Sequence, residues 1–136
     1  MAVVRLSGAG APGALEALGA GGLEPRQATV RWLREPEGRS VLDQALVIRF
    51  EAGGSFTGEA AGEIQCHGGP AVLSALLDAL ARLPGLRLAE PGEFARRALE
   101  NGRLSLLEAE ALADLIEAET EAQRRLALRA KRGALG

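Results

Sequence analysis

The sequence predicts an α+β domain in which a strand-rich first half is followed by helices. Short apolar runs with alternating side chains recur up to residue 68, and a period of two residues is typical of strands. Residues 70–83 instead repeat their leucines at helical spacing. A further stretch, starting near Ser105, has the same helical period and is expected to form a long helix to about Arg129.

Four strands are expected before residue 70. They span residues 2–8, 28–35, 41–52 and 62–68. The second and third should form a hairpin, because the intervening EPEGRS at 35–40 is rich in turn-forming residues. A short helix is expected over 13–19, and PGLRLAE at 84–90 predicts a turn followed by a short strand.

Three helix ends carry recognisable signals. Pro70 occupies the first helical position of 70–83, where its missing N–H costs nothing. The helix expected over 93–101 ends at Asn101 and Gly102, residues common at helix C-termini. Ser105 and Glu108 form a capping box for the last helix.

The last helix has an apolar face with little chain left to cover it. Its members are Leu107, Ala111, Leu112, Leu115, Ile116, Ala122 and Leu126. We therefore expect either a partner on this face or a chain that is the front part of a longer protein.

Composition narrows the classes of function. The 136 residues suffice for one domain, and the net charge of −2 argues against a protein that coats nucleic acid by neutralising phosphates. One cysteine allows no internal disulfide, and no signal peptide or membrane-length apolar run is found, which favours a cytoplasmic protein without membrane contact. The only lysine, Lys131, does not lie in a phosphate-binding P-loop.

Residues 8–13, GAGAPG, match the glycine pattern of dinucleotide-binding loops. They follow an expected strand and precede an expected helix, so the chain could be a small dinucleotide-binding protein. Against this, the helix is short, Pro12 stiffens the turn, and no acidic residue lies near the end of the next expected strand before Glu35. A flexible turn is the simpler interpretation in a chain with 18 glycines.

Residues 63–70, EIQCHGGP, hold the only cysteine and the only histidine of the chain. In a strand, Cys66 and His67 point to opposite faces, so they cannot form a nucleophile–base pair. No further cysteine or histidine exists to complete a zinc site. We expect Cys66 to be a core residue and His67 a turn residue hydrogen-bonded to backbone. Glu63 is either a paired structural charge or a ligand contact.

Three longer segments together resemble the N-terminal domain of the TrmE/MnmE family of tRNA-modification GTPases. They are VVRLSG at 3–8, SFTGEAAGEIQCHGGP at 55–70 and PGEFARRALENGRLSLLEAEALADLIEAET at 91–120. The resemblance implies a mixed or antiparallel sheet with helices on one side. It also implies a folate-binding and dimerisation domain over 1–103, followed at 104–136 by the start of a truncated helical domain. The GTPase domain of the family would be absent.

The resemblance further implies a function. Family members bind a one-carbon tetrahydrofolate, such as 5-formyltetrahydrofolate, in this domain and form homodimers through it. With a flavin-dependent partner protein they install an aminomethyl-type group at C5 of the tRNA wobble uridine. GTP, Mg²⁺ and K⁺ would bind only in the missing GTPase domain. This chain is therefore expected to meet tRNA only indirectly and not to be an active enzyme alone.

The folate contacts of the family fall on Arg5, Glu63 and Arg103 of this sequence. A carboxylate such as Glu63 can accept both neighbouring N–H donors of a pterin, and arginine matches the carboxylates of the folate tail. The family often has lysine where Arg103 stands, and arginine keeps the charge but changes its shape. The alternative for both arginines is a solvated surface charge.

An alternative function is a purely structural dimerisation domain. Family members usually have another strand and a glycine-rich loop before the VVRLSG segment, whereas Met1 lies only four residues before Arg5. The absence of that strand would leave a sheet edge exposed and break the folate site. The dinucleotide-binding protein that uses Gly8–Gly13 is the other alternative.

Overall fold

The structure, a computed structural model, describes residues 1–118. The chain divides into two compact units, Met1–Leu88 and Ala89–Gly136, which we describe separately. The family resemblance places the domain boundary at residue 103, and that boundary stays a prediction. No helix within 1–118 combines the length and apolar character needed to cross a membrane.

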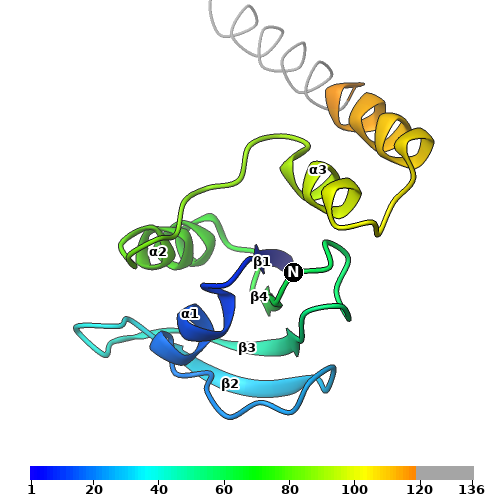
Figure 1. Ribbon diagram of the computed structural model, residues 1–136. Coiled ribbons are helices and arrows are strands. Elements are labelled where there is room, and N and C mark those ends of the chain that lie inside the picture. Colours follow the sequence, from blue (N-terminus) through cyan, green and yellow to red (C-terminus); the bar gives the residue numbers. More distant parts are fainter. Residues whose placement is uncertain (119–136) are drawn as a thin grey trace, which may run out of the picture. The chain divides into compact units, whose positions relative to one another are not determined.

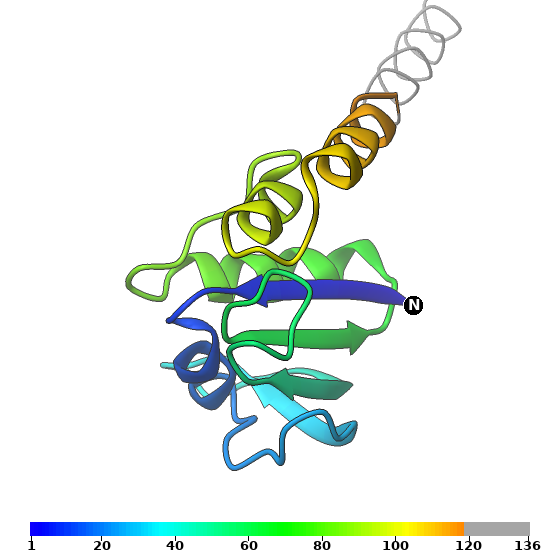
Figure 2. The same cartoon turned by 45° about the vertical axis from the view of Figure 1, so that its right-hand side comes forward.

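The first unit contains a four-stranded sheet and two helices (Figure 1). The strands are β1 (Ala2–Ser7), β2 (Thr29–Arg34), β3 (Val41–Phe50) and β4 (Ala61–Cys66), and the helices are α1 (Ala11–Ala17) and α2 (Pro70–Ala81). All strand pairs are antiparallel, in the order β1-β4-β3-β2, and the strands lie side by side in Figure 2. The predicted α+β class and the antiparallel sheet are confirmed.

Both helices pack on the same face of the sheet, which we call the inner face. Leu15 of α1 and Leu76 of α2 are fully buried in one cluster with Val47 and Ile64 of the sheet. The approach of α1 is very close, since a Cβ atom built on Gly62 would lie 2.8 Å from Leu15 Cδ1. A side chain at position 62 would therefore force the buried Leu15 to shift, and glycine permits this close approach of the helix to β4.

The second unit begins with α3 (Glu93–Glu100), followed by a helix over 106–118. The capping box of the latter helix is confirmed in both directions. The Glu108 N–H donates to Ser105 Oγ at 3.1 Å, and the Ser105 N–H donates to Glu108 Oε1 at 3.2 Å. The rest of the predicted long helix, to Arg129, lies outside the described residues.

The strand predicted within 84–90 is wrong. Residues 86–90 have no regular structure and pair with none of the strands described. Leu88 is 77% exposed, so the leucines that suggested a strand do not share a buried face. Alternating apolar residues form a strand only where a neighbouring strand can satisfy the backbone, and here there is none.

Candidate functional site

The two faces of β4 separate core residues from candidate site residues. Ile64 and Cys66 are buried on the inner face, whereas Glu63 and Gln65 point to the opposite, outer face, as the alternation predicted. Burial raises the pKa of the Cys66 thiol, and the nearby negative charge of Asp43 raises it further. Cys66 is thus a core residue with little thiolate character.

Arg5 and Glu63 meet on the outer face. They are directly opposite each other in the β1–β4 ladder, and Arg5 Nε donates to Glu63 Oε1 at 3.2 Å. Ile48 of β3 is the residue opposite Glu63 on its other side. The sheet therefore aligns Arg5, Glu63 and Ile48 in one row across three strands.

The Arg5–Glu63 pair is only partly satisfied. The Glu63 side chain is 18% exposed, yet its Oε2 accepts no hydrogen bond from residues 1–118. The Arg5 side chain is 66% exposed, and only its Nε is engaged among the described residues. One carboxylate oxygen and the terminal guanidinium nitrogens thus remain open to a ligand.

Arg103 belongs to the second unit and follows Gly102, which has a left-handed φ of 72°. Its backbone N–H donates to the carbonyl of Ala98 at 2.7 Å, which closes the end of α3. Its side chain is exposed and makes no ion pair with the described residues. The sheet brings two of the three predicted residues together, and Arg103 lies in the other unit.

His67 pairs with an aspartate rather than with backbone, which corrects our expectation for this residue. Its N–H donates to Asp43 Oδ2 at 2.9 Å, and its Nδ1 lies 2.7 Å from Asp43 Oδ1. Burial favours a higher pKa for Asp43, but the hydrogen bonds and charge of His67 outweigh it and lower that pKa. No local sequence pattern predicted Asp43 as the partner of His67, because 24 positions separate the two residues.

Residues 51–60, which we call the β3–β4 loop, cover one end of the outer face. Ser7 Oγ lies 2.5 Å from Thr57 Oγ1 and 2.9 Å from Glu59 Oε1. The Gly8 N–H donates to the carbonyl of Ala60 at 2.9 Å. Ala61, although on the outer face, is only 8% exposed. The sequence analysis did not predict this hydroxyl cluster, which holds the loop against β1 beside Arg5.

The interpretation of residues 8–13 as a dinucleotide loop is wrong. Such loops connect two parallel strands through a helix whose N-terminus faces the phosphates. Here β1 pairs only with the antiparallel β4, and α1 is a helix of 7 residues that leads to β2 at the far edge. The glycines instead form a tight turn, in which Gly8 has a φ of 122°.

Comparison with known proteins agrees with this fold and these residues. The model of the family described as "GTP-binding protein TrmE N-terminus" matches residues 1–103. The "tRNA modification GTPase MnmE" of Dinoroseobacter shibae is 58% identical over all of this chain, which covers 32% of that relative. Its counterpart from Parvibaculum lavamentivorans is 57% identical, with 31% covered. The chain spans about a third of the length of these relatives, and it belongs to the TrmE/MnmE family, whose N-terminal domain it matches.

Proposed function

We propose that this chain is the one-carbon-tetrahydrofolate-binding and dimer-forming module of a tRNA-modifying GTPase. The observation that carries the proposal is the half-satisfied Arg5–Glu63 pair on the outer face of the sheet. Family membership supports it, since relatives that match the whole chain bear the name tRNA modification GTPase. The Gly8–Gly13 alternative has lost its structural basis.

Glu63 reads the pterin ring in this proposal. A pterin presents a ring N–H and an exocyclic NH₂ side by side, and a carboxylate can accept from both. Glu63 Oε2 is free for one of these donors, and Oε1 can accept the second beside or in place of Arg5. The low exposure of Glu63 limits competition from water, which strengthens such charge-assisted bonds.

Arg5 and Arg103 neutralise the acid end of the ligand or bind the ring carbonyl. The terminal nitrogens of Arg5 donate to no described residue and form the planar fork that matches a carboxylate. Arg103 has an exposed side chain and supplies a second positive charge. Each contact of this kind contributes roughly 1.5–3 kcal/mol.

The proposal also covers the reaction of the whole tRNA-modifying GTPase. The folate supplies a carbon for an aminomethyl-type group at C5 of the wobble uridine, and a flavin-dependent partner takes part. GTP, Mg²⁺ and K⁺ act in a GTPase domain outside this sequence. The complex works in the cytoplasm, and this chain meets tRNA only through the larger assembly.

Association with a second copy of the chain is supported by exposed apolar side chains. Val3, Val30 and Trp32 are each about half exposed and lie on the outer face, where Leu46 of β3 is directly opposite Val30. Clusters of this kind mark association surfaces more often than chance. Sedimentation equilibrium of the purified chain should therefore give twice its mass of 14.1 kDa.

The test of folate binding is calorimetric titration with 5-formyltetrahydrofolate. Glu63→Gln replaces one acceptor oxygen by a donor and should weaken binding about tenfold or more, as expected when a charge-assisted bond is lost. Glu51→Gln is the matched control, because Glu51 pairs with Arg49 at 3.9 Å but is well exposed. It should bind as the wild type does.

Two outcomes contradict the proposal. Unchanged affinity in Glu63→Gln would remove Glu63 from the site. A dimeric wild-type chain that binds no 5-formyltetrahydrofolate would favour the purely structural dimerisation domain.

A further inference from the structure

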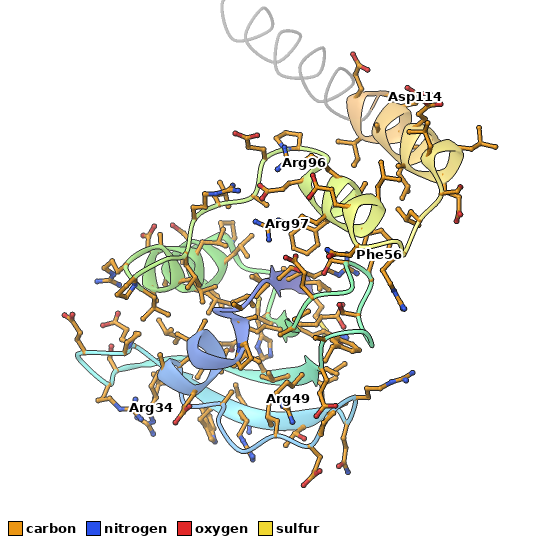
Figure 3. All side chains as sticks on the ribbon, in the orientation of Figure 1. Arg34, Arg49, Phe56, Arg96, Arg97 and Asp114 are labelled. Atoms are coloured by element: carbon orange, nitrogen blue, oxygen red, sulfur yellow. The ribbon has the colours of Figure 1, made fainter. Side chains whose placement is uncertain are left out.

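The β3–β4 loop, which contacts β1 at Ser7 two residues from Arg5, carries a half-exposed aromatic ring. Phe56 is 51% exposed and lies between two nearly buried residues, Ser55 at 6% and Thr57 at 1% (Figure 3). The hydroxyls of its neighbours are turned inward. Ser55 Oγ donates to the carbonyl of Glu59 at 2.5 Å, and Thr57 Oγ1 contacts Ser7.

These inward hydroxyls fix the loop rather than leave it free. The Gly53 N–H donates to the carbonyl of Gly58 at 2.9 Å, and both glycines have positive φ, 88° and 81°. A loop closed by its own backbone and tied to β1 through Ser7 has few alternative conformations. Phe56 is therefore presented from a rigid support, which is how a contact residue gains affinity without an ordering cost.

The β3–β4 loop contacts β1 beside the row formed by Arg5, Glu63 and Ile48. Ser7, which Thr57 contacts, is two residues from Arg5 on the same face of β1. Neighbouring side chains on one face of a strand are about 7 Å apart, and Phe56 is adjacent to Thr57 in the chain. A ligand that extends from Glu63 toward Ser7 along the outer face therefore approaches the loop segment that carries Phe56.

We propose that Phe56 is a specificity-determining contact for folate, whose flat conjugated rings stack on its side chain. This inference rests on the proposed folate-binding function. The row of Arg5, Glu63 and Ile48 offers charge and an aliphatic side chain but no aromatic surface. Phe56 supplies it, and stacked or edge-to-face aromatic pairs are favoured beyond simple burial.

The experiment compares folate affinity in a set of Phe56 variants of the full chain. Phe56→Leu keeps an apolar side chain but loses the ring, so binding of 5-formyltetrahydrofolate should weaken roughly three- to tenfold. Phe56→Tyr keeps the ring and should bind within about twofold of the wild type. Val41→Ala is the control, because Val41 is 50% exposed at the start of β3 and away from the loop.

Fragments identify which ring stacks. The Leu variant should lose binding selectively toward either tetrahydropterin or p-aminobenzoylglutamate, and either result supports stacking on Phe56. Melting temperatures of all variants should agree with the wild type within a few degrees, since the Phe56 ring is half exposed.

The outcomes separate this inference from the proposed function. If the wild type and Val41→Ala bind the folate and Phe56→Leu binds equally well, the stacking role is overturned while the folate site stands. A loss in the Tyr variant as large as in the Leu variant also overturns it. If the wild type binds no folate, both proposals fail together.

Discussion

The inner and outer faces of the sheet alternate along the same four strands, yet their side chains have different tasks. The inner face is continuous with α1 and α2, and Ile64, Val47 and Leu33 on it are fully buried. The outer face mixes the Arg5–Glu63 pair with half-exposed apolar residues such as Trp32. The difference indicates that one face determines stability and the other is available for binding.

The adjacent residues Ile64 and Glu63 test this division most directly. Ile64→Ala leaves a cavity on the inner face and should lower the free energy of unfolding by about 2–5 kcal/mol, measured by urea denaturation. The folded fraction should still bind folate normally. The milder Ile64→Val should cost about 0.5–1.5 kcal/mol and provides a measurable protein if the alanine variant does not fold.

Glu63→Gln should behave in the opposite way, with folate binding weakened and the unfolding transition little changed. The division between faces would be wrong if Glu63→Gln destabilised the chain as much as the cavity in β4 does. It would also be wrong if Ile64→Val changed folate affinity without changing stability.

A boundary case is Asp43, whose carboxylate ties the end of β4 to β3 through His67. Because the folded state lowers the pKa of Asp43 below its ordinary value of 3.8, its contribution to stability is present above that value. It is lost as pH falls through the lower, folded-state value. Asp43→Asn should therefore destabilise by about 1–2 kcal/mol near neutral pH, with a difference that shrinks below pH 4.

Urea denaturation at several pH values checks this dependence. Asp78→Asn is the control, because Asp78 is an exposed carboxylate on α2. A constant difference between wild type and Asp43→Asn from neutral to strongly acidic pH would show that the ionised carboxylate is not what holds His67.

The sequence predicted those features that are encoded within a few neighbouring residues. Pro70 and the Ser105–Glu108 capping box gave helix starts, and the period of two gave the faces of β4. The pairing of Arg5 with Glu63 was not visible in the sequence. Glu63 was already a candidate from its place in the strand, but Arg5 became one only through the family resemblance. Their contact depends on β1 and β4 being neighbours in the sheet.

What the sequence did not predict depends on contacts between distant positions. Asp43 reaches His67 across 24 positions, and Ser7 reaches Thr57 across 50. The strand predicted within 84–90 is absent for a related reason. The local pattern of these residues suggested a strand, but the fold provides no neighbouring strand to pair with it. Short polar side chains such as Ser7 have no periodic signal, so only the assembled sheet shows their role.

The smallest expected effect on stability concerns Arg5, and it sharpens the comparison most. A pair in which the arginine is 66% exposed contributes at most about 0.5 kcal/mol to folding after solvent screening. Arg5→Gln should therefore leave the urea midpoint almost unchanged while it weakens folate binding about tenfold, as expected for a lost charge-assisted contact. Arg82→Gln, at an exposed arginine that donates to its own helix at Asp78, should change neither quantity. A weak ion pair suits the proposed ligand site, because Glu63 can then accept from a pterin, beside or in place of Arg5, without a large loss in free energy. Arg5→Gln could instead lower the free energy of unfolding by more than about 1 kcal/mol and leave folate binding unchanged. The ion pair would then stabilise the sheet, and the proposal that the outer face binds folate would be contradicted.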